Sequence, residues 1–251
     1  MEAWHRHLDG MCIPCEIAPL PHGLLDAINS FIHEGGKVAL LAQVERIAEP
    51  LIARVGGRAF VRLGSRSPKD AYAWRSPRLP ITQGKQVIEA FANSERVQED
   101  LYEDEHAGAT THLVVCPYWD IPMWSEFRCF VKGRRVAAIS QYMYYERYSA
   151  LVACRDWLLN DVLLPFLGRV MPRLPMEDAV VDVAVGRDLE GPQDATQHTC
   201  FVVELNPLSP WTDPCLFDWE DPTLLTNASP AFRVVTEESA VPDLSKLFEK
   251  A

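Results

Sequence analysis

The sequence predicts an α+β protein, on three observations. Apolar residues recur at three- and four-residue steps over 23–34 and 38–54, which is typical of amphipathic helices. Val-rich runs such as 179–185 (AVVDVAV) are instead typical of buried strands. At 251 residues and 48% hydrophobic, the chain is long enough for one domain with two lobes. We expect sheets that are covered by helices on one side.

The first half of the sequence predicts helices around one short strand. The apolar patterns place helices over 23–34 and 38–54, a strand over 59–63, a loop over 64–70 and a helix over 82–103. Gly56 and Gly57 are expected to stop the second helix, and Pro68 suits a loop because it has no backbone N–H. Thr82 is the expected N-cap of the third helix.

The second half predicts most of the strands. In chain order we expect strands over 111–118, 125–132 and 135–141, a helix over 149–170, strands over 179–185 and 199–205, a short helix over 214–219, a strand over 231–236 and a helix over 242–249. The Lys-Gly-Arg sequence at 132–134 predicts a hairpin turn, and Pro172 should close the long helix. Residues 186–198 form a polar excursion between two strands.

Composition limits the kinds of partner. The net charge of −11 disfavours non-specific binding to nucleic acid or anionic membranes, but it allows attraction to a basic protein surface. No apolar run reaches the roughly 20 residues of a membrane span, and the N-terminal residues lack a signal-peptide pattern, so we expect a cytoplasmic protein without membrane contact. Seven cysteines, an odd number, suggest buried thiols and no structural disulfide.

Two apolar strands carry side chains suited to a metal ion. Asp182 lies within VVDVAV, and Glu204 and Asn206 lie within FVVELNP. Because Glu204 and Asn206 are two residues apart, they share one face of a strand. Mg²⁺ prefers oxygen ligands of this kind together with phosphate and water. The alternative from these residues alone is that Asp182 pairs with an arginine and Glu204 caps a neighbouring loop.

Basic residues elsewhere suit a triphosphate. Arg62, Arg66 and Lys69 lie around a Ser-Pro loop, and Arg128 lies inside the strand EFRCF beside Glu126. Arg binds phosphate through paired hydrogen bonds, and Lys acts as a point charge. Each of these residues could instead belong to an ion pair, and an internal Glu126–Arg128 pair is as plausible as a phosphate contact.

Other motifs give weaker signals. The sequence contains neither GxxxxGK[ST] nor GxGxxG, so a P-loop or a dinucleotide-binding fold has no motif support. Cys12 and Cys15 form a CxxC pair without the further ligands of a zinc site. Four tyrosines over 142–148 could stack a base or a partner, although aromatic residues at a strand end more often pack on the core.

Several blocks together resemble a known family. These are FVRLGSRSPKDA, SEFRCFVKGRRVAAISQ, VVDVAV, VVELNP and LFDWE, in this order. Over about residues 58–220 the chain is similar to the cell division cycle protein 123 family. The resemblance implies an ATP-grasp fold, with lobes over about 1–115 and 116–251 that hold Mg²⁺-ATP between them. It also implies an ATP-dependent chaperone that assembles translation initiation factor 2 by binding its gamma subunit, if the source is eukaryotic.

The resemblance also implies site residues. The metal ligands would be Asp182, Glu204 and Asn206. The residues around the nucleotide would be Arg62, Ser65, Ser67, Lys69, Asp70, Cys116, Pro117, Trp119, Glu126, Arg128 and Gln141. Eukaryotic members tend to carry a basic residue where this chain has Tyr142, which would remove one phosphate contact.

Two classes of function remain open from the sequence. In the chaperone class, bound ATP rigidifies the lobes for a protein partner. In the enzyme class, an ATP-grasp ligase activates a carboxylate or a nucleic-acid end, and Mg²⁺ neutralises charge on the transferred phosphate. A degenerate domain that serves only as a scaffold is a third interpretation. The sequence names no catalytic residue and does not predict the oligomeric state.

Overall fold

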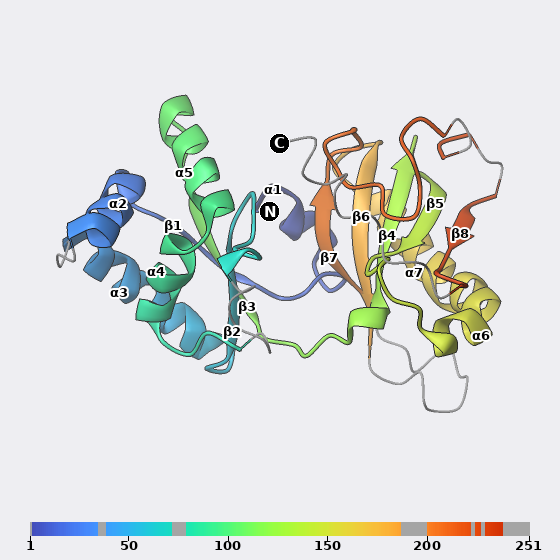
Figure 1. Ribbon diagram of the computed structural model, residues 1–251, viewed down its shortest axis with the longest axis horizontal. Helices are drawn as coiled ribbons and strands as arrows, with labels where there is room; N and C mark the ends of the chain where they lie inside the picture. Colours follow the sequence, from blue (N-terminus) through green and yellow to red (C-terminus); the bar gives the residue numbers. More distant parts are fainter. Residues whose placement is uncertain are drawn as a thin grey trace. The chain divides into compact units, whose positions relative to one another are not determined.

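The computed structural model describes residues 2–34, 39–71, 79–186, 200–221, 224–226 and 229–237. The chain divides into two compact units. Unit 1 contains Met1–Arg6 and Ile13–Asp120, and unit 2 contains His7–Cys12 and Ile121–Ala251. Each unit has its own sheet and its own helices (Figure 1).

Unit 1 is a three-stranded antiparallel sheet with helices. Its elements are α1 (Glu2–His5), β1 (Glu16–Pro19), α2 (Leu24–Glu34), α3 (Ala39–Arg54), β2 (Ala59–Leu63), α4 (Gly84–Ala92), α5 (Glu95–Ala107) and β3 (His112–Pro117). The strand order is β1-β3-β2. Apolar side chains of α2, α3, α4, α5 and the strands form one core, which includes Val44, Val61 and Phe91. The predicted helices over 23–34 and 38–54 and the strand over 59–63 are confirmed.

Helices α3 and α4 approach each other closely at one glycine. Gly84, the first residue of α4, donates its backbone N–H to Glu49 Oε1 of α3 at 2.7 Å. A Cβ atom at this position would lie 2.7 Å from the backbone oxygen of Glu45. The absence of a side chain at Gly84 therefore allows the two helices to pack.

The prediction of a single helix over 82–103 is wrong, because Asn93 and Ser94 separate two helices, α4 and α5. Ser94 is the N-cap of α5, and its hydroxyl accepts a hydrogen bond from the Val97 backbone at 3.1 Å. A serine cap satisfies an amide that has no partner within the helix, which favours a new start over continuation. The N-cap of α4 is Gln83, so the prediction for Thr82 is also wrong.

Unit 2 contains a five-stranded mixed sheet. Its main elements are β4 (Glu126–Lys132), β5 (Arg135–Gln141), α6 (Ser149–Trp157), a π-helix (Leu158–Leu163), α7 (Leu164–Val170), β6 (Ala179–Val185), β7 (Cys200–Asn206) and β8 (Ala231–Arg233). The order is β7-β6-β4-β5-β8, with β8 parallel to β5 and the other pairs antiparallel. Short 3-10 helices cover Arg6–Leu8, Met123–Ser125 and Met171–Arg173.

The predicted hairpin and long helix of unit 2 are confirmed. Strands β4 and β5 are joined at Gly133 and Arg134, and both of these residues have positive φ (54° and 58°), as a tight hairpin turn requires. The helical run from α6 to α7 spans the predicted 149–170, with the π-helix inside it. In Figure 1 these helices lie on one side of the sheet.

Three other expectations for unit 2 need correction. Strand β7 is an edge strand with mostly half-buried residues, whereas β6 is buried along its whole length, so only β6 is the central strand that its apolar run predicts. Residues 214–219 form turns and no helix, with Phe217 N–H bonded to the Pro214 carbonyl. Strand β8 is shorter than the predicted 231–236. Most of the polar excursion over 186–198, and the helix over 242–249, lie outside the described residues.

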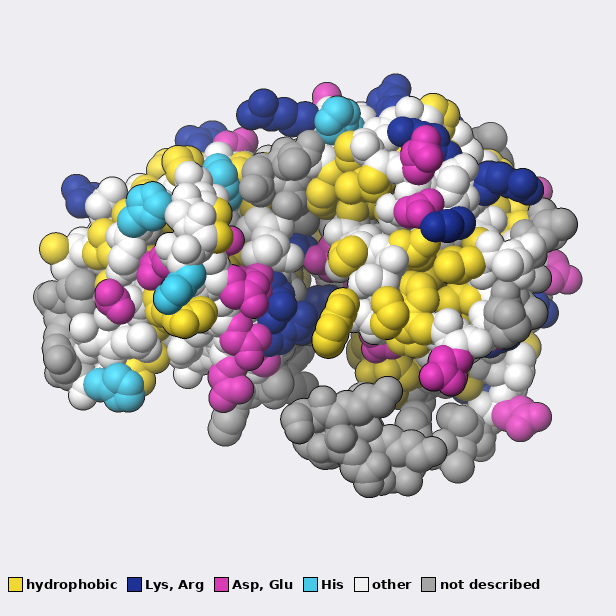
Figure 2. Space-filling model, turned by 90° about the horizontal axis from the view of Figure 1, so that it is seen from above, with side chains coloured by type: hydrophobic (Ala, Val, Ile, Leu, Met, Phe, Trp, Pro, Cys, Tyr) yellow, Lys and Arg dark blue, Asp and Glu magenta, His cyan; other side chains and the backbone are white. Residues whose placement is uncertain are grey.

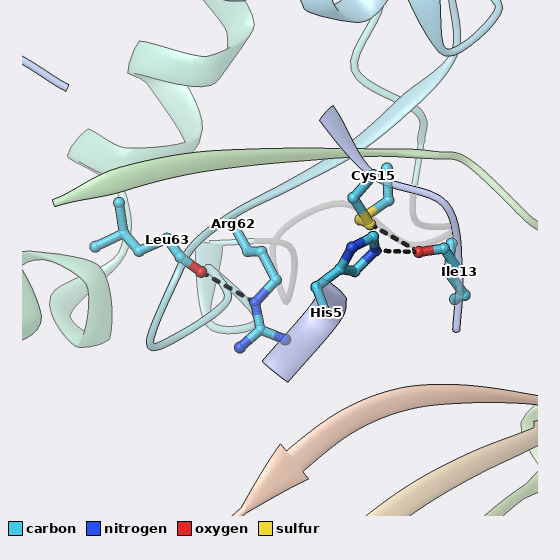
Figure 3. Close-up of a disulfide and its surroundings, with 6 residues drawn as sticks. His5, Ile13, Cys15, Arg62 and Leu63 are labelled. Atoms are coloured by element: carbon cyan, nitrogen blue, oxygen red, sulfur yellow. Dashed lines mark hydrogen bonds between the residues drawn. A yellow bond between two sulfur atoms is a disulfide. The ribbon is translucent and has the colours of Figure 1, made fainter. Parts of the chain in front are cut away.

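The expectation of free thiols only is also wrong. Cys15 and Cys116 form a disulfide within unit 1, where antiparallel β1 and β3 bring residue 15 opposite residue 116 (Figure 3). Sequence counting cannot reveal this pairing, since it depends on strand register. The cysteines at positions 129, 154, 200 and 215 are free thiols. Within the described part of the chain, no helix has the length and apolar character that a membrane span requires.

Candidate functional site

A buried ion pair lies at the centre of the unit 2 sheet. Arg128 on β4 is directly opposite Asp182 on β6. The guanidinium donates from Nε to Asp182 Oδ1 at 2.9 Å and from one terminal nitrogen to Oδ2 at 2.8 Å. The two side chains are only 7% and 5% exposed, respectively. The alternative that Asp182 pairs with an arginine is therefore confirmed.

Two further predicted residues lie beside this pair. Glu204 on β7 is opposite Asp182, so the two side chains share a face of the sheet. Asn206 lies two residues further along the same strand, and its amide nitrogen donates to Asp182 Oδ2 at 3.0 Å. The structure thus brings Arg128, Asp182, Glu204 and Asn206 together on one face, as a predicted metal site would require. Metal binding by these residues stays a prediction.

Arg128 remains charged despite its burial. Burial alone would lower the pKa of the guanidinium, but the hydrogen bonds and the charge of Asp182 raise it above its usual value. The Tyr142 ring centroid lies 4.9 Å from the guanidinium carbon, which adds a cation–π contact. A fixed positive charge is therefore held within the sheet, and Tyr142 stacks on it.

The loop after β7 completes the surroundings of Arg128. A second terminal nitrogen of Arg128 donates to the backbone oxygen of Asp213 at 2.8 Å. The Asp213 carboxylate accepts hydrogen bonds from the Cys215 backbone at 2.8 Å and from the Tyr144 hydroxyl at 3.1 Å. Burial raises the pKa of the Cys215 thiol to about 12, so it is not a nucleophile at neutral pH. The sequence analysis did not predict a role for Asp213. This residue lies between the family blocks VVELNP and LFDWE, and its position there is a signal that could have indicated it.

Gln141 has a structural role. Its side chain is fully buried, and its amide nitrogen donates to the backbone oxygens of Met143 and Glu146 at 2.6 and 2.7 Å. Its amide oxygen accepts from the Val235 backbone at 3.1 Å. Gln141 thereby holds the tyrosine-rich loop after β5 against the segment after β8. Contact with a nucleotide, which the sequence predicted for Gln141, stays a prediction.

The predicted phosphate residues of unit 1 lie on β2 and the loop after it. Arg62 is 4% exposed, and its guanidinium donates to the backbone oxygen of Leu63 at 3.1 Å (Figure 3) and to that of Ser65 at 3.0 Å. Ser67 is buried, while Ser65 is exposed and Lys69 is half-buried. Arg62 thus braces the loop that carries both serines. These residues belong to a different unit from Arg128.

Arg66 and Asp70 connect this loop to α5. The Arg66 guanidinium pairs with Glu99 and Asp100 at 3.0 and 3.1 Å. Asp70 accepts hydrogen bonds from the Ser94 hydroxyl at 2.5 Å and from the Arg96 backbone at 3.2 Å. Burial opposes ionisation of Asp70, but these hydrogen bonds outweigh it and lower the pKa of the carboxyl. The negative charge lies at the N-terminus of α5, where the helix dipole favours it.

Replacing Asp70 with asparagine is expected to lower the free energy of unfolding by about 0.5–1 kcal/mol at pH 7, since the uncharged amide loses the helix-dipole interaction. The folded-state pKa of Asp70 lies below 3.8, so its contribution is present above that pH and is lost as the pH falls through the folded-state value. Urea unfolding of both proteins at pH 7 and at about pH 3 measures this. A difference that is equally large at both pH values would contradict the assignment.

The residues predicted to meet an adenine are at the end of β3. Cys116 forms the disulfide, and Pro117 is paired with Ala59 of β2. Trp119 is half-buried just beyond the strand. The backbone N–H of Tyr118 donates to the Arg58 carbonyl at 2.8 Å. This amide is therefore engaged within unit 1.

No group of three or more His, Cys, Asp or Glu side chains that could hold a metal ion occurs in the described ranges. The candidate magnesium ligands are not a group of this kind, because one of them is the amide of Asn206. Cys12 and Cys15 do not form a zinc site, since Cys15 is bonded to Cys116.

A solved structure shares this fold. The structure of Cdc123 from Schizosaccharomyces pombe superposes with a TM-score of 0.75 and 22% sequence identity, and the match covers 94% of each chain. The predicted α+β class is confirmed.

Sequence comparisons give the same assignment. The D123 family matches residues 33–249, so the chain belongs to the D123 family. The translation initiation factor eIF2 assembly protein of Schizosaccharomyces pombe is 26% identical over 239 residues, which covers 87% of this chain and 70% of that protein. Its namesake from Danio rerio is 27% identical over 198 residues, covering 75% of this chain and 54% of that protein. The resemblance to the cell division cycle protein 123 family is confirmed. The chain spans between about half and 70% of the length of the curated relatives it matches.

Proposed function

We propose that this protein is an ATP-binding assembly factor that acts on a protein partner related to translation initiation factor 2 in the cytoplasm. The name shared by its relatives, eIF2 assembly protein, supports the type of partner. Family membership over 33–249 supports carrying the proposal to this chain. We also propose the ATP-grasp assignment of the fold, which the resemblance implies.

One observation carries the nucleotide proposal: the half-buried Asn206 donates to the buried Arg128–Asp182 pair, and Glu204 lies opposite Asp182. A buried ion pair adds little stability compared with apolar residues of the same volume, so stability alone is a weak reason for it. A guanidinium has five N–H donors, and three of those of Arg128 bond to Asp182 and Asp213. Arg128 could therefore bond a phosphate oxygen and keep Asp182.

The neighbouring oxygen donors fit Mg²⁺. Glu204 supplies a carboxylate, and Asn206 supplies an amide oxygen because its nitrogen is bonded to Asp182. Mg²⁺ is typically held by one or two carboxylates together with phosphates and water. Both oxygens of Asp182 accept bonds from Arg128, so we assign Asp182 chiefly to positioning Arg128 and Asn206. Bound Mg²⁺ would supply positive charge to the phosphates.

We assign the phosphate contacts of unit 1 to the loop that Arg62 braces. Ser65, Ser67 and Lys69 lie on this loop, and a braced backbone loses little conformational entropy when it meets a ligand. Residues 116–119 are the proposed adenine segment. Glu126 remains a proposed neighbour of Arg128, two residues away on the same face of β4.

Calorimetric titration with ATP, with and without Mg²⁺, tests the proposal. We expect Mg²⁺-dependent binding in the wild-type protein, and a loss of at least about tenfold in Asn206→Ala and in Glu204→Gln, since each removes a ligand oxygen or its charge. Asp178→Asn is the matched control, because Asp178 pairs with Lys132 on the surface. Unchanged affinity in both site variants would contradict the metal assignment.

Turnover and partner binding complete the test. Binding without turnover, followed by ATP-dependent association with a purified gamma subunit of initiation factor 2, supports an assembly factor. ATP turnover that is stimulated by a carboxylate or a nucleic-acid end would instead favour a ligase. The absence of ATP binding in the wild-type protein would overturn the nucleotide proposal.

A further inference from the structure

One large apolar side chain of unit 2 is almost entirely in solvent. Trp211 is 96% exposed, whereas the other exposed large apolar residues lie between 38% and 55% in the described ranges. It belongs to the loop after β7. This loop begins at the upper end of the sheet in Figure 1. Figure 2 looks down on that end of unit 2, where hydrophobic side chains gather among acidic and basic ones. An indole in water forgoes a large hydrophobic gain, so its exposure favours a docking role.

The loop that carries Trp211 is firmly held. The next residue, Thr212, is 7% exposed, and its hydroxyl donates to the Pro207 carbonyl at 2.6 Å. The Thr212 backbone bonds to the Ser209 carbonyl at 2.9 Å, and the Trp219 indole donates to the Thr212 carbonyl at 2.7 Å. Prolines at 207, 210 and 214 restrict the backbone further. The backbone beside Trp211 is thus held, which lowers the entropy cost of ordering this loop on binding.

The surroundings of Trp211 in the chain are acidic. Residues 207–221 contain four carboxylates and no Lys or Arg. Asp213, Asp218 and Glu220 are exposed, and the half-buried Asp221 pairs with Arg233. Arg128, which also contacts this segment, is 6% exposed and bonded to Asp182. The exposed surface of the segment is therefore negative.

We propose that Trp211 is the anchor of a docking surface for a basic segment of a protein partner. A Lys or Arg side chain would lie over the indole face, the best cation–π acceptor among side chains, and neighbouring cations of the segment would face Asp218 and Glu220. An anionic membrane or a nucleic-acid phosphate would be repelled by the same carboxylates. The net charge of −11 favours encounter with a basic partner.

This inference extends the proposed function by naming the chemistry of the partner, but it does not depend on nucleotide binding. A second exposed aromatic residue provides a matched comparison. Tyr102 on α5 of unit 1 is 54% exposed and also lies among carboxylates, yet its ring is against His106, with 3.9 Å between ring centroids. If negative charge alone were enough, a basic segment would bind at both Tyr102 and Trp211. The proposed docking surface requires Trp211.

The test uses the full chain and a labelled hexapeptide of alternating Gly and Arg, with a Gly-citrulline peptide as the neutral control. Fluorescence anisotropy measures affinity, and the indole N–H resonance assigned to Trp211 by comparison with Trp211→Phe reports its contact. We expect about fivefold weaker binding of the Arg peptide by Trp211→Ser, no change in Tyr102→Ser, and little binding of the citrulline peptide.

A double variant, Asp218→Asn with Glu220→Gln, retains Trp211 and should also weaken binding, so the proposal remains testable if Trp211→Ser fails to fold. Equal affinity of wild type and Trp211→Ser, or equal binding of both peptides, would overturn the proposal. A shift of the Trp211 resonance by ATP but not by the Arg peptide would overturn it in favour of base stacking. Asn206→Ala should lose ATP and still bind the peptide, which separates failure of this inference from failure of the nucleotide proposal.

Discussion

Replacing Asp182 with alanine is expected to lower the free energy of unfolding by about 3–5 kcal/mol, because it leaves a charged guanidinium buried without its partner. Among the described residues, Arg128 would retain only the backbone oxygen of Asp213 as a hydrogen-bond acceptor, and Asn206 would lose the carboxylate to which it donates. Urea unfolding, followed by far-ultraviolet circular dichroism, measures the change.

Two variants isolate the cause of this loss. Asp178→Ala removes a carboxylate from an exposed pair with Lys132 and should change stability little. Asp182→Leu combined with Arg128→Met removes both charges and should recover most of the loss, because apolar residues can replace a buried pair. An effect of Asp182→Ala no larger than that of Asp178→Ala would contradict the account of the buried pair.

Replacing Gly84 with alanine is expected to lower the free energy of unfolding by about 1–3 kcal/mol through overpacking. The new methyl group would lie 2.7 Å from the backbone oxygen of Glu45, which has no side-chain freedom to move away. Helices α3 and α4 would have to separate, and the bond from the Gly84 amide to Glu49 would lengthen. The free energy of unfolding, again from urea titration, measures this cost.

A second helical glycine provides the control. Gly168 lies in α7 of unit 2, and a Cβ atom there would meet nothing within 4 Å. Gly168→Ala should therefore raise the free energy of unfolding by about 0.5–1 kcal/mol, because alanine has the higher helix propensity. Destabilisation by both substitutions would show that the helical glycines act through something other than the contact at Glu45.

The local pattern of the sequence predicted most helices and strands. It failed where contacts between residues far apart in the sequence determine the structure. The break at Ser94 divides the single predicted helix in two, and Phe91 and Val97, which are six residues apart, would not share a face of one continuous helix. The cap at Ser94 is reinforced by Asp70, which is 24 residues away in sequence. Strands β6 and β7 have similar composition, and only the sheet order distinguishes the central strand from the edge.

In the candidate site, too, local patterns predicted some features, whereas contacts between residues far apart in the sequence determine the others. The two-residue spacing of Glu204 and Asn206 was enough to predict a shared face, and the apolar surroundings of Asp182 indicated a buried acid in need of a partner. The partner itself, Arg128, is 54 residues away, so the sequence left it as an alternative. The bond between Tyr144 and Asp213 joins loops 69 residues apart, and no local pattern predicts it.

The disulfide between Cys15 and Cys116 also changes the covalent connectivity of the polypeptide. Together with the backbone from 15 to 116, a sequence separation of 101, it closes a covalent ring that contains β2, the loop after it and helices α2 to α5. A protease that cuts one peptide bond in this ring opens it but releases no fragment, since the disulfide still joins the two pieces. The cut protein would run as one species in a denaturing gel and separate into two only after a reductant is added.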